Sequence, residues 1–226
     1  MRHFCMITLI ISLMVVFSCC SKPAKSPDFL YGSKLYNNFT NYYLKGEPEL
    51  AEMAFAKAEY QFLKMDAMCN LSRIYIGRYV LDEDNSEYNV LAKAKEYGKL
   101  GDCSSELEAI RYLSGEKYDK TLLPAPYNIL AGADNEKLVS ISEDKETSDY
   151  TKTRLLRKVA IDYLVTDPEK SFELAGKALV IDKFNGWSLN ILRDLIIVKI
   201  ALEKQGKETE EIIKRIDLIK VSLGKK

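Results

Sequence analysis

The clearest helical pattern in the chain is Pro48-Glu-Leu-Ala-Glu-Met-Ala-Phe-Ala-Lys-Ala-Glu-Tyr-Gln-Phe-Leu63. Its apolar residues recur at the 3.6-residue period of a helix with one buried face. They are Leu50, Ala51, Ala54, Phe55, Ala58 and Phe62. Pro48 suits a first helical turn, where its missing N–H would have no partner in any case. The pattern predicts a helix over 49–63.

The same stretch recurs 120 residues later, without a gap. Between 43 and 76 the two copies share nine identical residues over 34 positions. The shared pairs are Tyr43/Tyr163, Leu44/Leu164, Pro48/Pro168, Glu49/Glu169, Lys57/Lys177, Ala58/Ala178, Asn70/Asn190, Arg73/Arg193 and Ile76/Ile196. An internal repeat of this kind is typical of proteins built by stacking one supersecondary unit.

Helical periodicity continues through most of the chain, and the alternation of a half-buried strand does not persist anywhere after the N-terminal segment. Further helices are predicted at 67–81, 88–100, 104–113, 151–165, 168–181, 187–204 and 208–223. Their lengths and the short turns between them predict an all-α fold of stacked antiparallel helical hairpins. The domain spans 34–226, with halves at about 34–115 and 150–226.

An irregular connector is expected over 116–149. Pro124 and Pro126 prevent a continuous helix there, because each lacks an N–H and restricts the residue before it. Ser142 to Ser148 reads as a charged loop.

The spacing of small and aromatic residues resembles the tetratricopeptide repeat family, whose units of about 34 residues pair two helices. Ala51, Phe55 and Ala58 match the family's second helix, and the next copy matches it with alanine in place of the aromatic residue. That next copy is Ser171, Ala175 and Ala178. The resemblance is degenerate and covers about 34–82 and 155–205. It implies an α-solenoid that presents a curved groove to a peptide or partner subunit and rarely catalyses.

The N-terminus has the pattern of a secretory signal. Arg2 precedes 14 uncharged residues from Phe4 to Phe17, too few for a span of about 20 residues across a bilayer. The run ends Val16-Phe17-Ser18-Cys19, which resembles a lipobox, although Phe17 is bulkier than usual. We therefore expect residues 1–18 to be a lipoprotein signal peptide and Cys19 to carry the lipid, with Cys20 as the alternative site.

Residues 19–33 are expected to form an extended tether, because Pro23 and Pro27 disfavour helix. Acyl chains on one cysteine would hold the chain to a membrane of the cell envelope. In some enterobacteria an aspartate directly after the lipidated cysteine retains a lipoprotein in the inner membrane. Cys20 holds that position here, so the outer membrane is weakly favoured over the inner membrane.

The sequence lacks residues on which several classes of enzyme activity depend. His3 is the one histidine and lies in the signal segment, so histidine-dependent nucleophilic, acid–base and zinc sites are not expected. No glycine-rich phosphate loop occurs, and the 33 basic and 33 acidic residues balance. We expect no cofactor, no metal, no nucleic-acid partner and no enzyme, although a carboxylate-dependent cell-wall enzyme stays an alternative.

Cysteine and tyrosine leave two questions open. Cys69 and Cys103 are interpreted as small core residues, with a disulfide as the alternative. Eleven of the 14 tyrosines lie at or before Tyr118. Most are expected in the repeat core, and Tyr36, Tyr43 and Tyr79 are the candidates for a binding face.

The expected function is that of a membrane-anchored lipoprotein of the cell envelope. It would act as a non-catalytic scaffold that binds or assembles envelope proteins through a helical-repeat groove. The alternative is a ligand-binding accessory subunit of a solute transporter.

Overall fold

The protein is described by a computed structural model that covers residues 26–82 and 88–224, and the described part is all-helical. The first half contains α2 (Pro27–Lys45), α3 (Pro48–Lys64), α4 (Met68–Leu81), α5 (Tyr88–Leu100) and α6 (Ser104–Leu113). Next come η1 (Lys120–Leu122), α7 (Tyr127–Leu130) and α8 (Asn135–Glu143). The second half contains α9 (Asp149–Tyr163), α10 (Pro168–Asn185), α11 (Ser188–Lys204) and α12 (Glu210–Ser222).

The predicted helices are confirmed, with ends that move by a few residues. The predicted tether is wrong over 27–33, which belong to α2. Ser26 caps this helix by accepting a hydrogen bond from the Phe29 N–H at 3.2 Å, and Pro27 occupies its first turn. The ring of Phe29 then packs edge-on against Phe62 of α3, so burial fixes the segment as helix. Residues 1–25, with Cys19 and Cys20, lie outside the described residues.

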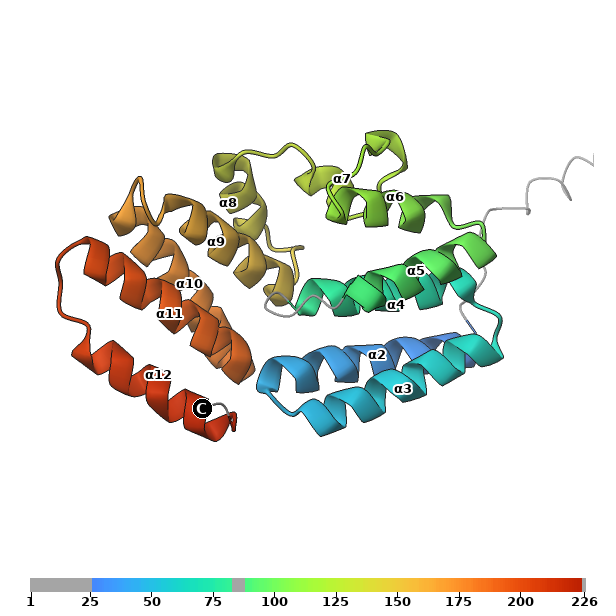
Figure 1. Cartoon of the computed structure of the whole chain (residues 1–226), viewed down its shortest axis with the longest axis horizontal. Coiled ribbons are helices and arrows are strands. Elements are labelled where there is room, and N and C mark those ends of the chain that lie inside the picture. The colour runs from blue at the N-terminus through green and yellow to red at the C-terminus, as the bar shows by residue number, and fades with distance from the viewer. Residues whose placement is uncertain (1–25, 83–87, 225–226) are drawn as a thin grey trace, which may run out of the picture.

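Each half has its own apolar core. In the first half α2 packs along α3, and α4 along α5 (Figure 1). Aromatic rings run through this core, with Phe55 placed 4.9 Å from Phe39 and 5.0 Å from Tyr75 between ring centroids. The second core lies among α8, α9, α10 and α11 and is built mainly from leucine, valine and alanine.

The internal repeat corresponds to similar local structures. Pro48 and Pro168 both begin a helix, and Ala58 and Ala178 are both fully buried, as the shared spacing predicts. The copies differ in how the third helix packs, because α10 and α11 contact each other far more than α3 and α4 do.

The connector is more ordered than the sequence indicates. Its prolines do exclude a long helix, but α8 fills part of it, capped by Asp134 and packed through Leu138 into the second core. Asp144 to Ser148 forms the loop that precedes α9.

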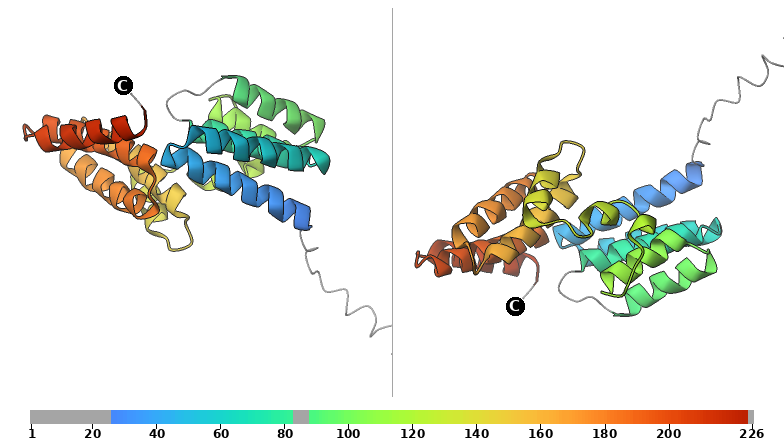
Figure 2. Two further views of the ribbon diagram at one scale, coloured as in Figure 1. Left: turned by 90° about the horizontal axis from the view of Figure 1, so that it is seen from below. Right: turned by 90° about the horizontal axis from the view of Figure 1, so that it is seen from above.

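The halves meet where the end of α2 approaches the start of α11 (Figures 1 and 2). The Trp187 indole N–H donates to Asn41 Oδ1 at 3.3 Å, and Arg193 donates to the Leu81 carbonyl at 3.4 Å. Trp187 thus packs onto the core of the opposite half.

Among the described helices, none has both the length and the apolar character needed to cross a bilayer.

Candidate functional site: a cavity between the two halves

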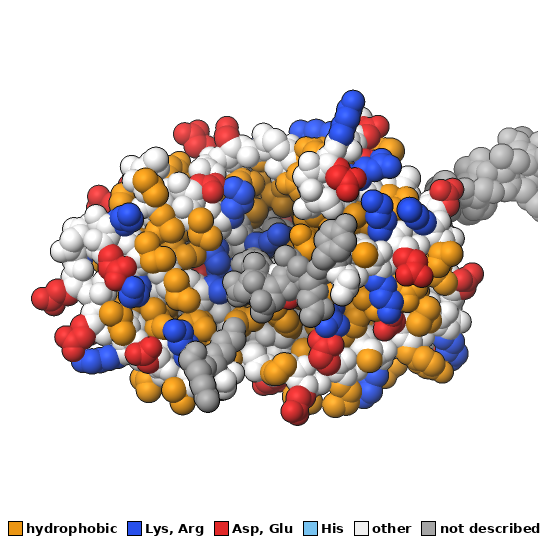
Figure 3. All heavy atoms as spheres, in the orientation of Figure 1, with side chains coloured by type: hydrophobic (Ala, Val, Ile, Leu, Met, Phe, Trp, Pro, Cys, Tyr) orange, Lys and Arg blue, Asp and Glu red, His pale blue; other side chains and the backbone are white. Residues whose placement is uncertain are grey.

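A cavity of about 890 Å³ opens between the halves of the molecule. Its walls come from α2, α4, α6, the connector from α7 into α8, and α9. Hydrophobic side chains and Lys or Arg side chains surround the hollow on the face shown in Figure 3. The volume falls within the range of about 300–1,000 Å³ that small-molecule sites occupy.

Four tyrosines form the aromatic part of the lining: Tyr36, Tyr112, Tyr127 and Tyr150. The rings of Tyr112 and Tyr127 lie 5.8 Å apart between centroids. Burial raises the pKa of the Tyr36 phenol above its ordinary value and raises the pKa of Tyr127 to about 12. Both phenols therefore stay neutral at physiological pH, where they can donate or accept hydrogen bonds.

Gly77 of α4 makes room for the Tyr36 ring. A Cβ atom at position 77 would lie 1.8 Å from the Tyr36 hydroxyl oxygen and 2.9 Å from its Cζ. Any larger residue would displace the phenol, so the glycine sets the position of this wall.

The α9 wall carries charge. Arg154, Lys158 and Asp162 recur every four residues and so share one face of the helix. The Lys158 ammonium pairs with an Asp162 carboxylate oxygen at 2.7 Å. Both side chains of this pair are largely solvent-exposed, so the pair contributes little to stability, on the order of 0–1 kcal/mol.

Arg157, also in the lining, is held from behind by two buried carboxylates. Its Nε donates to Asp194 at 2.8 Å, and its Nη2 donates to Asp182 at 2.8 Å. Asn190 adds a hydrogen bond to Asp182 at 3.3 Å. Both aspartates have no exposed surface.

Two carboxylates facing one guanidinium would leave a net negative charge in a dry site. Burial is the main cause that raises the pKa of Asp194 to about 8, and the nearby Asp182 adds to it, against the opposing charge of Arg157. We therefore assign a proton to Asp194 at neutral pH. That proton makes the Arg157–Asp182–Asp194 cluster neutral.

This buried cluster is confined to one copy of the repeat. At the positions aligned with Arg157, Asp182 and Asp194 the first half has Asn37, Phe62 and Ile74. The ring of Phe62 belongs to the apolar core there.

Of the three aromatic residues predicted for a binding face, Tyr36 lines the cavity. Tyr43 instead donates to Asp82 at 3.2 Å, and Tyr79 packs against the first core. Most tyrosines were expected in the core, but Tyr60 of α3 is 68% exposed. Sequence reasoning missed Tyr112, Tyr127 and Tyr150, which come from separate segments with no shared spacing.

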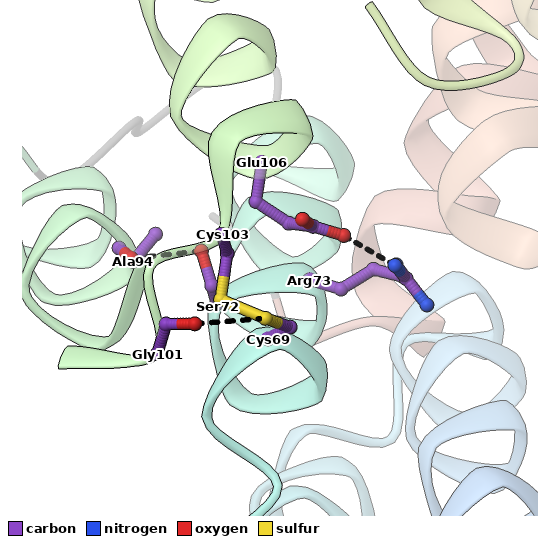
Figure 4. The surroundings of a disulfide bond; sticks show 7 residues. All are labelled: Cys69, Ser72, Arg73, Ala94, Gly101, Cys103 and Glu106. Carbon is purple, nitrogen blue, oxygen red and sulfur yellow. Dashed lines mark hydrogen bonds and ion pairs between the residues drawn. A yellow bond between two sulfur atoms is a disulfide. The ribbon is translucent and has the colours of Figure 1, made fainter. Parts of the chain in front are cut away.

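Cys69 and Cys103 form a disulfide that joins the start of α4 to the residue before α6 (Figure 4). The interpretation of both as separate core thiols is therefore wrong. The Cys69 sulfur lies 3.7 Å from the Gly101 carbonyl oxygen, a contact rather than a hydrogen bond because a disulfide sulfur carries no hydrogen.

The surroundings of the disulfide do not form a metal site in this state. Glu106 lies within 4.8 Å of both sulfurs, but it pairs with Arg73, and neither sulfur is a thiolate. Ser72 ties α4 to α5 beside it by donating to the Ala94 carbonyl at 2.8 Å.

Comparison with known protein families, curated proteins and solved structures finds no match for this chain.

Proposed function

We propose that this chain is a lipid-anchored, non-catalytic binding protein of the cell envelope that holds a ligand in the cavity between its halves. The observation that carries the proposal is the cavity itself, whose wall combines four tyrosines with aliphatic side chains and a few polar groups. Mostly apolar walls with a small number of polar groups are typical of ligand sites. The binding role extends the helical-repeat reading, in which the halves are degenerate tetratricopeptide-like units of a short solenoid.

The disulfide supports export. Disulfides persist in oxidising compartments and are rare where thioredoxin and glutathione keep thiols reduced. The Cys69–Cys103 bond therefore agrees with the signal peptide expected at 1–18 and with lipid on Cys19. A Cys19→Ala chain should lose incorporation of labelled palmitate and stay uncleaved. Labelling that persists until Cys20 is also replaced would move the site by one residue.

The carboxylates of the described residues favour binding over catalysis. Glycoside hydrolysis commonly requires two carboxyl groups about 5–9.5 Å apart on either side of the substrate. Asp162 is the acidic residue that the described lining provides, and it is paired with Lys158. Asp182 and Asp194 are fully buried behind Arg157.

The test is a titration with N-phenyl-1-naphthylamine, a neutral aromatic probe that fluoresces in apolar sites. The chain from residue 26 onward is suitable, because every described helix and core lies within it. Ala133 lines the cavity, so Ala133→Phe should fill it and reduce probe affinity. Ala56, which is exposed on α3, provides the control Ala56→Phe. Equal affinity in the wild type and in Ala133→Phe would refute the proposed site.

A second candidate function is that of an assembly scaffold, favoured by an apolar stripe on α10. Phe172, Val180 and Phe184 recur on one face of this helix and are 41%, 68% and 88% exposed. A photo-crosslinking residue at 184 should capture an envelope protein, whereas one at the exposed Lys204 should not. A captured transporter subunit would favour an accessory role, and no adduct at 184 would exclude the scaffold.

A further inference from the structure

We infer that the end of the first half at which α2 begins is a membrane-contact surface, which rests on the phospholipid bilayer that holds the lipid anchor. We call this surface the proximal end, and it comprises residues 27–31, 61–68 and 99–103. The inference rests on one part of the proposed function, the lipid on Cys19. It adds how the folded domain meets the membrane, and it makes no use of the cavity.

The three segments of the proximal end lie together in space. Gln61 of α3 donates to a carboxylate oxygen of Asp28 at 3.0 Å, which places the last turn of α3 beside the first turn of α2. The disulfide between Cys69 and Cys103 joins the start of α4 to the turn that follows α5. Figures 1 and 2 show that these helix ends all lie at one end of the first half.

The distance from this end to the expected lipid is short. Residues 20–25 separate Cys19 from Ser26. The seven steps from Cys19 to Ser26 span at most about 25 Å, at about 3.6 Å per residue. Ser26 caps α2 and Pro27 occupies its first turn, so the folded domain begins directly after these residues. The proximal end is therefore the part of the described structure that the anchor holds nearest to the headgroups.

Large apolar side chains are exposed at the proximal end. Leu30 and Tyr31 in the first turns of α2 are 56% and 53% exposed, Leu63 in the last turn of α3 is 43% exposed, and Leu100 at the end of α5 is 67% exposed. Single exposed leucines are common, but these four side chains gather where the tether enters. Tyrosine is enriched at membrane–water interfaces, and leucine gains free energy when it leaves water for the acyl boundary. The proximal end thus presents the residue types that an interfacial contact uses.

The disulfide holds this surface in a fixed shape. A Cβ atom at Gly101 would lie 2.7 Å from the Met68 Cβ, so the turn after α5 packs directly onto the start of α4. Leu100 precedes the first of these residues, and Leu63 lies across the α3–α4 turn from the second. The two leucines can therefore enter a bilayer boundary without first losing conformational freedom of the backbone, which favours binding.

Charged side chains at the proximal end have both signs. Lys64 and Lys99 stand beside the two leucines, whereas Asp66 and Asp102 follow in the turns, and all four are exposed. Among the described residues this end therefore offers no field of one sign that would select anionic headgroups. Burial of apolar side chains drives the contact, so a bilayer of zwitterionic phosphatidylcholine should be sufficient.

The experiment uses the lipidated mature chain in phosphatidylcholine vesicles whose acyl chains carry bromine, a short-range quencher of tryptophan fluorescence. Trp187 is the one tryptophan of the chain, and its indole donates to Asn41. Asn41 lies about 21 Å along α2 from Pro27, at 1.5 Å per residue. The wild-type emission should therefore be unchanged by bromine. Leu100→Trp should add emission that shifts to shorter wavelength on vesicles and is largely lost when the lipid is brominated.

Matched variants locate the contact. Phe184→Trp places an equally exposed tryptophan on α10 in the other half, and its emission should not be quenched. Adding Leu63→Asn to Leu100→Trp should reduce the quenching, because it removes an apolar side chain from the proximal end. Adding Leu218→Asn instead should not, since Leu218 is exposed on α12. Anionic phosphatidylglycerol in the vesicles should leave the quenching unchanged.

The outcomes separate the anchor from the contact. If the chain floats with vesicles and carries palmitate, but Leu100→Trp is quenched no more than Phe184→Trp, the anchor stands and the inference is overturned. A chain that neither carries palmitate nor floats with vesicles would remove the anchor and the inference together, while the titration of the cavity would be unaffected. Thermal melting of each variant confirms that the comparison is made on folded protein.

Discussion

At the scale of single residues, Gly77 and Gly176 are a matched pair of glycines inside helices. A Cβ at Gly77 would collide with the Tyr36 hydroxyl, whereas a Cβ at Gly176 meets nothing within 4 Å. Gly77→Ala should therefore destabilise the fold by about 1–3 kcal/mol, as overpacking does. It should also weaken probe binding, because Tyr36 must leave its place in the cavity wall.

Gly176→Ala is the control for helix propensity. Because the site is open, the substitution should stabilise α10 by up to about 1 kcal/mol and leave probe affinity unchanged. Urea unfolding measures both variants. A Gly77→Ala chain as stable as the wild type would show that Tyr36 can move without cost.

The proton assigned to Asp194 predicts a dependence of stability on pH. The native pKa of about 8 lies above the ordinary value of 3.8, so the native state binds more protons than the unfolded state between these limits. This contribution is complete below about pH 4 and falls as pH rises toward 8, with a slope of at most about 1.4 kcal/mol per pH unit.

Asp194→Asn tests this assignment, because an amide imitates the neutral acid and does not titrate. The variant should lose the decline in stability between pH 5 and 8, as measured by thermal unfolding across that range. Asp162→Asn, on the exposed surface of α9, should keep the decline. A wild-type chain whose stability is flat over this range would mean that Asp194 is ionised.

Buried residues were easier to predict from the sequence than residues of the cavity wall. The repeat pairs Ala58, which lies on the predicted apolar face of its helix, with Ala178, and both are fully buried. Tyr36, Tyr43 and Tyr79 all pack against the first core, yet of these three it is Tyr36 that also lines the cavity. The periodicity of a helix indicates which face is buried, but it does not distinguish a core from a cavity wall.

At the scale of elements, the disulfide links α4 to the start of α6. It closes a loop with a sequence separation of 34, so its loss should cost about 2–4 kcal/mol. The double variant Cys69→Ala/Cys103→Ala should unfold at correspondingly lower urea, and reductant should lower the stability of the wild type alone. Equal unfolding with and without reductant would contradict a structural role.

The helices themselves were largely predictable, because long periodic segments with prolines and glycines at their ends carry a strong local signal. The beginning of α2 was not predictable in this way. Pro27 was interpreted as a helix breaker, but it occupies the first turn of the helix. The Ser26 cap is a local signal that could have shown this, whereas the contact of Phe29 with Phe62 is tertiary. The order within 116–149 also depends on packing, through Leu138.

At the scale of the whole molecule, the angle between the halves determines the cavity, and no local pattern encodes that angle. The repeat predicted two similar units, but α11 packs against α10 in a way that α4 does not pack against α3. The cavity walls come from helices of both halves, which are not packed alike. The cavity could therefore not be derived from the repeat alone.

The joint between the halves gives the last prediction. The Trp187 indole donates to Asn41 across the joint, and its ring lies 6.4 Å from that of Tyr150, which lines the cavity. Trp187→Phe keeps an aromatic ring but loses the hydrogen bond, a change worth about 0.5–1.5 kcal/mol. Because the joint helps to position Tyr150 in the cavity wall, we expect weaker binding of N-phenyl-1-naphthylamine with unchanged far-ultraviolet circular dichroism.

Phe184→Leu is the matched control, since Phe184 is close in sequence and 88% exposed. It should change neither the affinity nor the spectrum. Full affinity in Trp187→Phe, together with a lowered melting temperature, would mean that the indole stabilises the fold without positioning the cavity. A loss of affinity without loss of helix would instead show that binding depends on how the halves are held, because every helix that lines the cavity would still be formed.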